Sequence, residues 1–382
     1  MSVLVRNDTL ARGWKRYFIM HKDRRVATIR EDGSCTVYYP SFLPYNLYLE
    51  KAEEGDMDTR LMNLTNFYYW CASRVLTLDR AYAKEILNSI GAKQATSDRE
   101  RAQIALSYHA LSLTDVYWVR EDRKEVSFAE LSLYNHSLSG AFADVSLCGK
   151  QLTAQNTELL TPADAAGDVG TMGVAPKAWI RDKDSFLLLK DGAERDVRAE
   201  LLASRIADCF RIEHVRYEEG RFEGSLVSQS RIITSEERSI VSAEYINVYC
   251  VNHDTELLSF VLKKDPYNYY MMNILDYLVG NVDRHWGNWG FWADNLTNKL
   301  TTLHPLMDFN KSFLSYDTVE GARCQTAEGN VSQREAAIAA VREIRLNQIA
   351  PVDPAWFESD SEREMFFLRL ETLKAVEKEH NT

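Results

Sequence analysis

The sharpest chemical feature of the sequence is an aspartate followed five residues later by an asparagine in a polar segment. Asp283 and Asn288 lie in NVDRHWGN (281–288), and an Asp-Phe pair begins at Asp308. Phosphoryl transfer from ATP requires a carboxylate that orients the attacking hydroxyl and oxygen ligands that hold Mg²⁺ on the phosphates. Mg²⁺ prefers such hard oxygen donors. We therefore expect Asp283, Asn288 and Asp308 to be catalytic, with Asn288 and Asp308 as the metal ligands.

Structural explanations for the same residues stay open. Asp283 and Arg284 can form a loop salt bridge, and Asn288 belongs to a residue type that favours turns. The hairpin-length spacing to Asp308 and a lysine upstream favour phosphoryl transfer instead. We expect His285 to brace the loop by bonding to backbone rather than to react, and we count it among the cofactor-binding residues.

A lysine at the end of an apolar segment is the second candidate catalytic group. Lys190 follows Phe-Leu-Leu-Leu (186–189), a position from which its ammonium can reach the α- and β-phosphates of ATP. Such a lysine needs an acidic partner. Glu200 on the following predicted helix is the candidate, with Glu194 as a competitor nearer the start of that helix. The alternative is a surface lysine at a strand end.

A glycine-containing loop, GDVGTMGVAPK (167–177), precedes that strand. Its backbone N–H groups could cradle phosphates. It matches neither the Walker A pattern GxxxxGK[ST] nor the protein-kinase GxGxxG, and a flexible linker is an equal alternative. The candidate cofactor-binding residues in this loop are Gly170, Thr171, Gly173 and Lys177.

The elements that must position these residues follow from local patterns. Aromatic and β-branched stretches predict strands at 14–20, 26–30, 35–39, 178–189, 215–217, 224–233, 245–249, 289–293 and 300–304. Helical spacing and caps predict helices at 77–90, 99–110, 196–209, 269–279 and 361–378, and one that follows a capping box at Ser332 to Glu335. The order is a strand with a lysine, a helix with a glutamate, more strands, and a helical part with a polar loop and a hairpin.

That order predicts an α+β, bilobal, protein-kinase-like fold. A chain of 382 residues is too long for one compact core. We expect an accessory region of strands and then helices at 1–150, a kinase N-lobe-like region at 151–260, and a helical C-lobe with the catalytic loop at 261–382.

Composition narrows the class of protein. The net charge of −11, from 45 basic and 56 acidic residues, disfavours direct nucleic-acid binding. The absence of a long apolar run predicts no membrane span, and the N-terminus lacks a signal-peptide pattern, so we expect a cytoplasmic protein. The six cysteines form no CxxC pair and are expected to be free thiols.

The sequence resembles the HipA-like serine/threonine kinases of bacterial toxin–antitoxin systems. The resemblance rests on NVDRHWGN (281–288), HPLMDF (304–309), GVAPKAW (173–179) and FLLLK (186–190), and it spans roughly 165–375. It implies a bilobal kinase fold, Mg-ATP, and transfer to Ser or Thr hydroxyls. By position, Asp283 resembles the catalytic aspartate, Asn288 and Asp308 the Mg²⁺ ligands, and Lys190 the phosphate-contacting lysine.

Two regions depart from that family. Where family toxins carry an autophosphorylated serine, this chain has Gly170, with Thr171 next to it. The first 150 residues match poorly, so the substrate of the family toxins is not carried over.

These features support three hypotheses about function. The leading one is an ATP- and Mg²⁺-dependent Ser/Thr protein kinase, with a toxin–antitoxin or regulatory role, a protein acceptor and an antitoxin-like partner. The second is a small-molecule phosphotransferase of the aminoglycoside or choline kinase type. The third is a nucleotide-binding pseudokinase scaffold, which the complete set of Lys190, Asp283, Asn288 and Asp308 disfavours.

Overall fold

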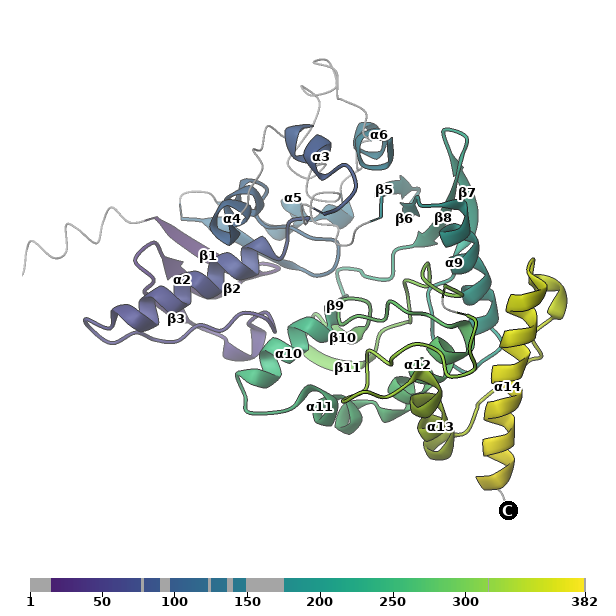
Figure 1. The fold of residues 1–382 in the computed structure, drawn as a ribbon. Helices are drawn as coiled ribbons and strands as arrows, with labels where there is room; N and C mark the ends of the chain where they lie inside the picture. Colours follow the sequence, from purple (N-terminus) through teal and green to yellow (C-terminus); the bar gives the residue numbers. More distant parts are fainter. Residues whose placement is uncertain are drawn as a thin grey trace, which may run out of the picture. The chain divides into compact units, whose positions relative to one another are not determined.

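The chain divides into two compact units (Figure 1). The computed structural model describes residues 15–76, 79–89, 97–122, 125–135, 140–148, 175–314 and 316–380. The first unit runs to Asp184 and includes two later segments, Thr234–Ser239 and Asp294–Asn298. The second unit holds Ser185–Ile233, Ile240–Ala293 and the chain from Lys299 onward.

The first unit contains a four-stranded sheet in the order β3-β2-β1-β4. Every neighbouring pair is antiparallel. The sheet is built from aromatic and β-branched residues, which suit a pleated surface, and Ile19, Val26 and Ile29 are fully buried in it. Its strands are β1 (Arg16–His21), β2 (Arg24–Arg30), β3 (Cys35–Val37) and β4 (Tyr117–Glu121).

Helices of the first unit begin at residues that satisfy their free N–H groups. Asp56 accepts from the N–H of Thr59 at 3.0 Å, and Ser97 and Glu100 form a capping box. The helices are α2 (Met57–Ala72), α3 (Ala83–Ser89), α4 (Asp98–Ser107), α5 (Phe128–Leu131) and α6 (Gly140–Cys148), with short 3-10 turns at Pro40–Phe42 and Leu133–Asn135. Strand β5 (Lys177–Asp182) also belongs here.

The strands of the second unit hold the lysine identified above. Strands β6 (Ser185–Lys190), β7 (Glu218–Phe222) and β8 (Ser225–Arg231) lie in the order β6-β8-β7 and pair antiparallel. Between β6 and β7 runs helix α9 (Glu194–Ala207), whose buried residues include Val197, Ala203 and Ile206. This spacing is that of an apolar helix face.

The remainder of the second unit is mainly helical, with α12 (Pro266–Val279) at its core. From Met271 to Val279 this helix is almost entirely buried. It begins with a proline and ends at Gly280, which has left-handed backbone, as expected for a helix end. The other helices are α10 (Ala243–Val251), α11 (Leu257–Lys264), α13 (Gln333–Ile344) and α14 (Asp360–His380), with a 3-10 turn at Pro354–Trp356.

Two strands of a three-stranded sheet lie in the chain between α12 and Asp308. Strands β9 (Arg238–Ser242), β10 (Gly290–Asp294) and β11 (Lys299–Leu303) lie in the order β11-β10-β9. The β10–β11 hairpin follows the polar loop 281–288 directly and precedes Asp308. The hairpin therefore sets the chain length between the two predicted metal ligands.

The predicted α+β class and kinase-like order of parts are confirmed, but three predicted strands are wrong. Residues 215–217 precede β7 and belong to no strand, and 178–189 holds two strands separated by a turn instead of one. Residues 245–249, predicted as a strand, lie in helix α10. Ser242 caps this helix by accepting from the N–H of Tyr245 at 3.4 Å, and Ile246 and Cys250 are buried four residues apart. Tyr and Val favour strands, which masked the helical spacing. The three-way domain division stays a prediction.

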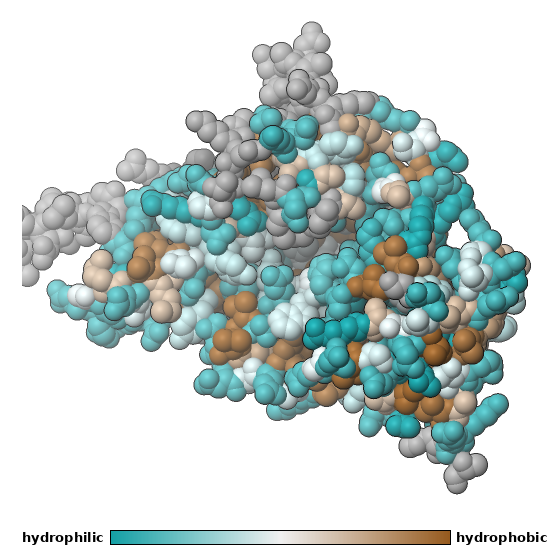
Figure 2. Space-filling view, in the orientation of Figure 1, coloured by the Kyte–Doolittle hydropathy of each residue, from teal (hydrophilic) through white to brown (hydrophobic). Residues whose placement is uncertain are grey.

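The surface agrees with the charge content of the sequence. The face in Figure 2 is largely hydrophilic, with hydrophobic residues in separate patches. Exposed apolar side chains include Met57, Leu61 and Met62 on α2. Among the described residues, none of the helices has the length and apolar character needed to cross a membrane.

Gly280 should be far less tolerant of a side chain than a second glycine with positive φ. A Cβ at Gly280 (φ +59°) would lie 2.5 Å from the Tyr316 ring, whereas a Cβ at Gly224 (φ +89°) meets nothing within 4 Å. We expect Gly224→Ala to cost about 1 kcal/mol through backbone strain alone. Gly280→Ala adds overpacking and should cost about 2–4 kcal/mol. Urea unfolding of both variants measures this, and equal losses would contradict it.

Candidate active site

The ammonium of Lys190 lies between two carboxylates in the second unit. Its Nζ is 2.9 Å from Oε1 of Glu200, and it forms a second ion pair with Oδ1 of Asp308. Lys190 and Glu200 are 6% and 1% exposed, so their charges are removed from water. A buried charge is tolerated when it is paired and hydrogen-bonded. The contact joins strand β6, helix α9 and the segment that follows β11.

Strand register and helix spacing place this pair. Lys190 stands opposite Ser228 in the β6–β8 ladder, and the Ser228 hydroxyl donates to Oε2 of Glu200 at 2.6 Å. Both oxygens of Glu200 are thus bonded. Glu194, the competing partner, is exposed and instead pairs with Arg198 at 2.7 Å. Of the two acidic candidates, Glu200 is the one that contacts Lys190.

The two carboxylates keep Lys190 charged. Burial alone would lower the pKa of Lys190, but the charges of Asp308 and Glu200 outweigh it and raise that pKa above its ordinary range. The side chain is therefore a permanent cation at neutral pH, as a phosphate-binding group requires.

A buried arginine fixes the loop 281–288. Nε and Nη2 of Arg284 each donate to the carboxylate of Asp276 on α12 at 2.9 Å. Its Nη1 donates to the carbonyls of Asn288, at 3.2 Å, and Met307. One planar guanidinium therefore ties the end of the helix, the loop and the chain entering Asp308 together.

Asn281 connects the main chains of the two candidate aspartates. Its Oδ1 accepts from the N–H of Asp283 at 3.2 Å, and its Nδ2 donates to the carbonyl of Asp308 at 3.5 Å. The carbonyl of Asn281 in turn accepts from Gln333 of α13 at 2.6 Å. These bonds hold Asp283 and Asp308 in a fixed relation although they lie 25 positions apart in the chain.

The loop leaves its candidate reactive groups available. Nδ2 of Asn288 donates to the carbonyl of Asp283 at 2.8 Å. This leaves the other side-chain atom, Oδ1, as a candidate ligand for a metal ion. Asp283 is partly exposed, and its carboxylate accepts no hydrogen bond from the residues that the structure describes. His285 is exposed, and its Nδ1 accepts from the N–H of Gly287 at 3.0 Å, which is a contact with loop backbone.

Asp308 has a left-handed backbone with φ of 60°. A non-glycine residue there costs about 1–2 kcal/mol, although aspartate tolerates it better than most. Its N–H donates to the hydroxyl of Tyr217 at 3.1 Å. Strain of this kind concentrates at functional sites where neighbouring contacts hold it.

The structure brings together most of the predicted site residues. Lys190, Glu200, Asp283, Asn288 and Asp308 belong to one connected network of hydrogen bonds in the second unit, with His285 in the same loop. Lys177 is the buried first residue of β5 and belongs to the first unit. The other predicted loop residues, Gly170, Thr171 and Gly173, lie outside the described residues.

Several residues of the network were not predicted. Asp276 had a usable signal, because an acidic residue inside an otherwise apolar helix usually has a buried partner. Tyr217, Ser228 and Gln333 contact the site through long-range packing, with no local pattern to mark them. Asn281 lies in the motif 281–288, but its contact with Asp308 was not predicted.

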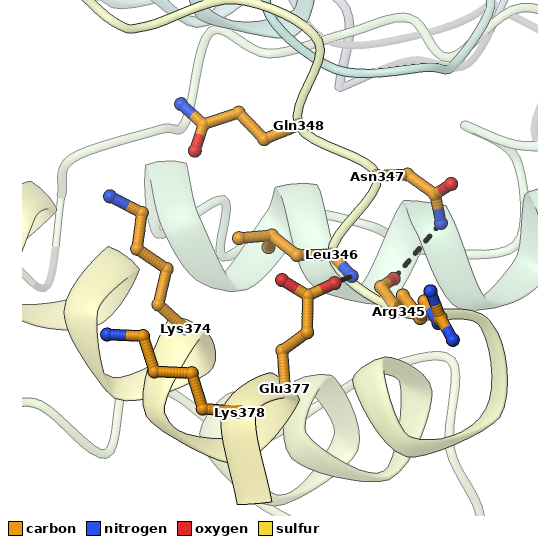
Figure 3. Close-up of a pocket in the computed structure, with 7 residues that line it drawn as sticks. All are labelled: Arg345, Leu346, Asn347, Gln348, Lys374, Glu377 and Lys378. Carbon is orange, nitrogen blue, oxygen red and sulfur yellow. Dashed lines mark hydrogen bonds between the residues drawn. The ribbon is translucent and has the colours of Figure 1, made fainter. Parts of the chain in front are cut away.

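A hollow elsewhere in the second unit is a separate feature (Figure 3). Lys374, Glu377 and Lys378 project into it from α14, and the Glu377 carboxylate accepts from the N–H of Leu346 at 2.9 Å. Its remaining lining residues are Arg345, Asn347 and Gln348. None of these residues belongs to the network around Lys190.

Comparison with known proteins gives similarity at the level of structure only. No protein-family model matches the sequence, and no curated protein matches it. A Shewanella oneidensis MR-1 HipA structure, from a toxin–antitoxin complex of HipA, HipB and operator DNA, has a TM-score of 0.49 and 12% identity, covering 95% of this chain and 97% of that one. The Helicobacter pylori proinflammatory kinase CtkA has a TM-score of 0.39 and 13% identity, covering 53% of this chain and 94% of that one.

Both TM-scores lie below 0.5 and both identities are low. We therefore base the functional proposal on this chain's own residues.

Loss of the Arg284 partner should cost far more stability than loss of a surface pair. Asp276→Asn leaves a buried guanidinium without its counter-charge and should cost about 3–5 kcal/mol. Glu358→Gln is the matched control, because it breaks a pair with Arg198 in which the side chains are 71% and 47% exposed, and it should cost under about 1 kcal/mol. Urea unfolding compares the two, and a small loss for Asp276→Asn would contradict the role assigned to this pair.

Acid should destabilise the second unit partly through His304. Burial lowers the pKa of His304 from 6.5 to about 4. Between these values the unfolded chain binds a proton that the folded chain does not, so stability is present above pH 6.5 and is lost as the pH falls toward 4. The loss should reach about 3 kcal/mol. His304→Gln should flatten the plot of unfolding free energy against pH, and an unchanged slope would contradict this.

Proposed function

We propose that this chain is an ATP- and Mg²⁺-dependent phosphotransferase and, within that class, a HipA-like Ser/Thr protein kinase. One observation carries the proposal. The buried Lys190 contacts Glu200 of α9 and Asp308 at the same time, while Asn281 links Asp308 to the loop of Asp283 and Asn288. A lysine–glutamate pair, a loop aspartate and asparagine, and a later aspartate are the parts that phosphoryl transfer uses.

The donor atoms at the site fit Mg²⁺ and nucleotide phosphates. Asp308 supplies a carboxylate and Asn288 an amide oxygen, and both are hard donors. The Asn288 side chain is already held by the carbonyl of Asp283 at 2.8 Å, which reduces the entropy lost when it binds. Lys190 supplies the positive charge that the α- and β-phosphates require.

Each residue has a distinct role in the proposed reaction. Bound Mg²⁺ would offset negative charge on the phosphates. Asp283 orients the acceptor hydroxyl and accepts its proton late, as the new O–P bond forms and the bond to the leaving ADP oxygen breaks. Lys190 stabilises charge that develops on the phosphates. The Arg284–Asp276 pair keeps the loop in place so that Asp283 loses little freedom when substrate binds.

Nucleotide binding requires a change of partners at Lys190. The ammonium of Lys190 contacts Asp308 as well as Glu200. In the proposed complex Asp308 would hold the metal, while Lys190 would keep its contact with Glu200 and bind the phosphates. The flexible lysine stem suits this exchange.

The Ser/Thr acceptor and the toxin–antitoxin role are the finer parts of the proposal. They are supported by the motifs shared with HipA-like kinases. In the Shewanella complex, HipA is found with HipB and operator DNA. An antitoxin-like protein partner for this chain belongs to the proposal because of the shared motifs.

Removing the charge of Asp283 should greatly slow phosphotransfer and leave nucleotide binding unchanged. We expect Asp283→Asn to lower phosphotransfer from γ-labelled ATP by about 10²–10⁴-fold. Asp308→Asn should instead weaken Mg-ATP binding by about 10–100-fold. The matched control is Asp254→Asn, which makes the same chemical change at an exposed turn between α10 and α11.

The measurement uses pure protein with Mg²⁺ and labelled ATP, with and without a bacterial lysate. Label on a protein that depends on Asp283 supports a protein kinase. Transfer confined to small molecules would replace it with the small-molecule phosphotransferase. Equal transfer by Asp283→Asn and the parent would overturn the assigned site, and saturable Mg-ATP binding without any transfer would favour the pseudokinase.

A further inference from the structure

Tyr217 contacts the metal-ligand candidate although no motif includes it. It lies just before β7, and its hydroxyl accepts the backbone N–H of Asp308 at 3.1 Å. The two residues are 91 positions apart in the chain. The contact is therefore a product of the fold and not of a local turn.

The backbone of Asp308 needs such a contact. With φ of 60° it lies in the left-handed region, which residues with a side chain rarely adopt. Asn281 binds its carbonyl at 3.5 Å and Lys190 binds its carboxylate. Tyr217 binds its N–H, so the three polar groups of Asp308 each have a partner from a different segment.

Tyr217 is itself fixed by the helix that positions Lys190. Its backbone N–H donates to the hydroxyl of Ser204 at 3.3 Å, and that hydroxyl donates to the carbonyl of Val215 at 3.1 Å. Ser204 and Glu200 are four residues apart on α9, so they lie on the same face. The same turn of helix therefore holds the partner of Lys190 and the support of Tyr217.

The phenol contributes a hydrogen bond without adding charge to the site. A tyrosine hydroxyl is uncharged at neutral pH. It can accept from Asp308 without repelling the carboxylate of that residue.

We propose that Tyr217 is a positioning residue that holds the left-handed backbone of Asp308 and so aims its carboxylate at the site of the metal. This inference rests on the proposed function, because Asp308 is a metal ligand only in a phosphotransferase. It also makes the geometry of the metal site depend on the position of α9. A displacement of that helix would disturb Lys190 through Glu200 and Asp308 through Ser204 and Tyr217.

Two isosteric substitutions test the proposal. Tyr217→Phe removes the hydroxyl that binds Asp308. Tyr269→Phe is the matched control, because Tyr269 is 4% exposed and its hydroxyl donates to the backbone carbonyl of Thr326 at 3.1 Å, away from the network. The first readout is the Mg²⁺ concentration for half-maximal ATP binding, measured by calorimetry. The second is the rate of hydrogen exchange at the Asp308 amide in the ligand-free chain.

We expect Tyr217→Phe to raise the half-saturating Mg²⁺ concentration about five-fold, the effect of one lost hydrogen bond. Exchange at the Asp308 amide should become faster. Tyr269→Phe should match the parent in both readouts. A purely structural role would lower stability alike in both variants and leave the Mg²⁺ requirement unchanged.

Each outcome decides the matter. Equal Mg²⁺ requirements in the two variants, with the parent binding Mg-ATP, overturn the role of Tyr217 and leave the proposed function standing. A parent that binds no Mg-ATP overturns the proposed function and this inference with it. If Tyr217→Phe does not fold, Ser204→Ala takes its place, and an unchanged Mg²⁺ requirement there also overturns the inference.

Discussion

The ammonium of Lys190, buried between two carboxylates, is the interaction on which the rest of the site depends. Removing a single buried charge from water costs several kcal/mol, and only good geometry with further hydrogen bonds compensates for it. Here Glu200 and Asp308 provide the opposite charges, and Ser228 bonds the second oxygen of Glu200. Because those groups come from separate elements, the need to neutralise one cation fixes the relation of sheet, helix and loop.

Arg284 is a second buried cation, and its contacts differ from those of Lys190. Its guanidinium is also buried, but it binds Asp276 through two parallel bonds and two backbone carbonyls in addition. A guanidinium held by these four hydrogen bonds is rigid. The two buried cations thus have different roles. The arginine makes the loop rigid, whereas the lysine makes contacts that, under the proposed function, a nucleotide would replace.

Local patterns were enough for most elements, whereas the reactive groups assigned to the loop stay a prediction. The proline and glycine at the ends of α12 and the capping box of α13 are signals within a few residues, and the structure places those helices accordingly. Long-range packing determines the features that local patterns did not predict. Residues 245–249 have strand-forming composition and lie in a helix, and the support of Asp308 by Tyr217 spans 91 positions of the chain.

The strained backbone of Asp308 is held by contacts that leave its carboxylate to a separate partner. Left-handed aspartate is costly by itself, so the conformation persists only while Asn281 and Tyr217 hold its carbonyl and its N–H. Those two contacts involve the backbone, and neither occupies the carboxylate. The carboxylate is bound by Lys190, a side chain that can change partners. Under the proposed function, the backbone of this residue is therefore fixed, as a metal ligand requires, while its carboxylate can change partners when a metal binds.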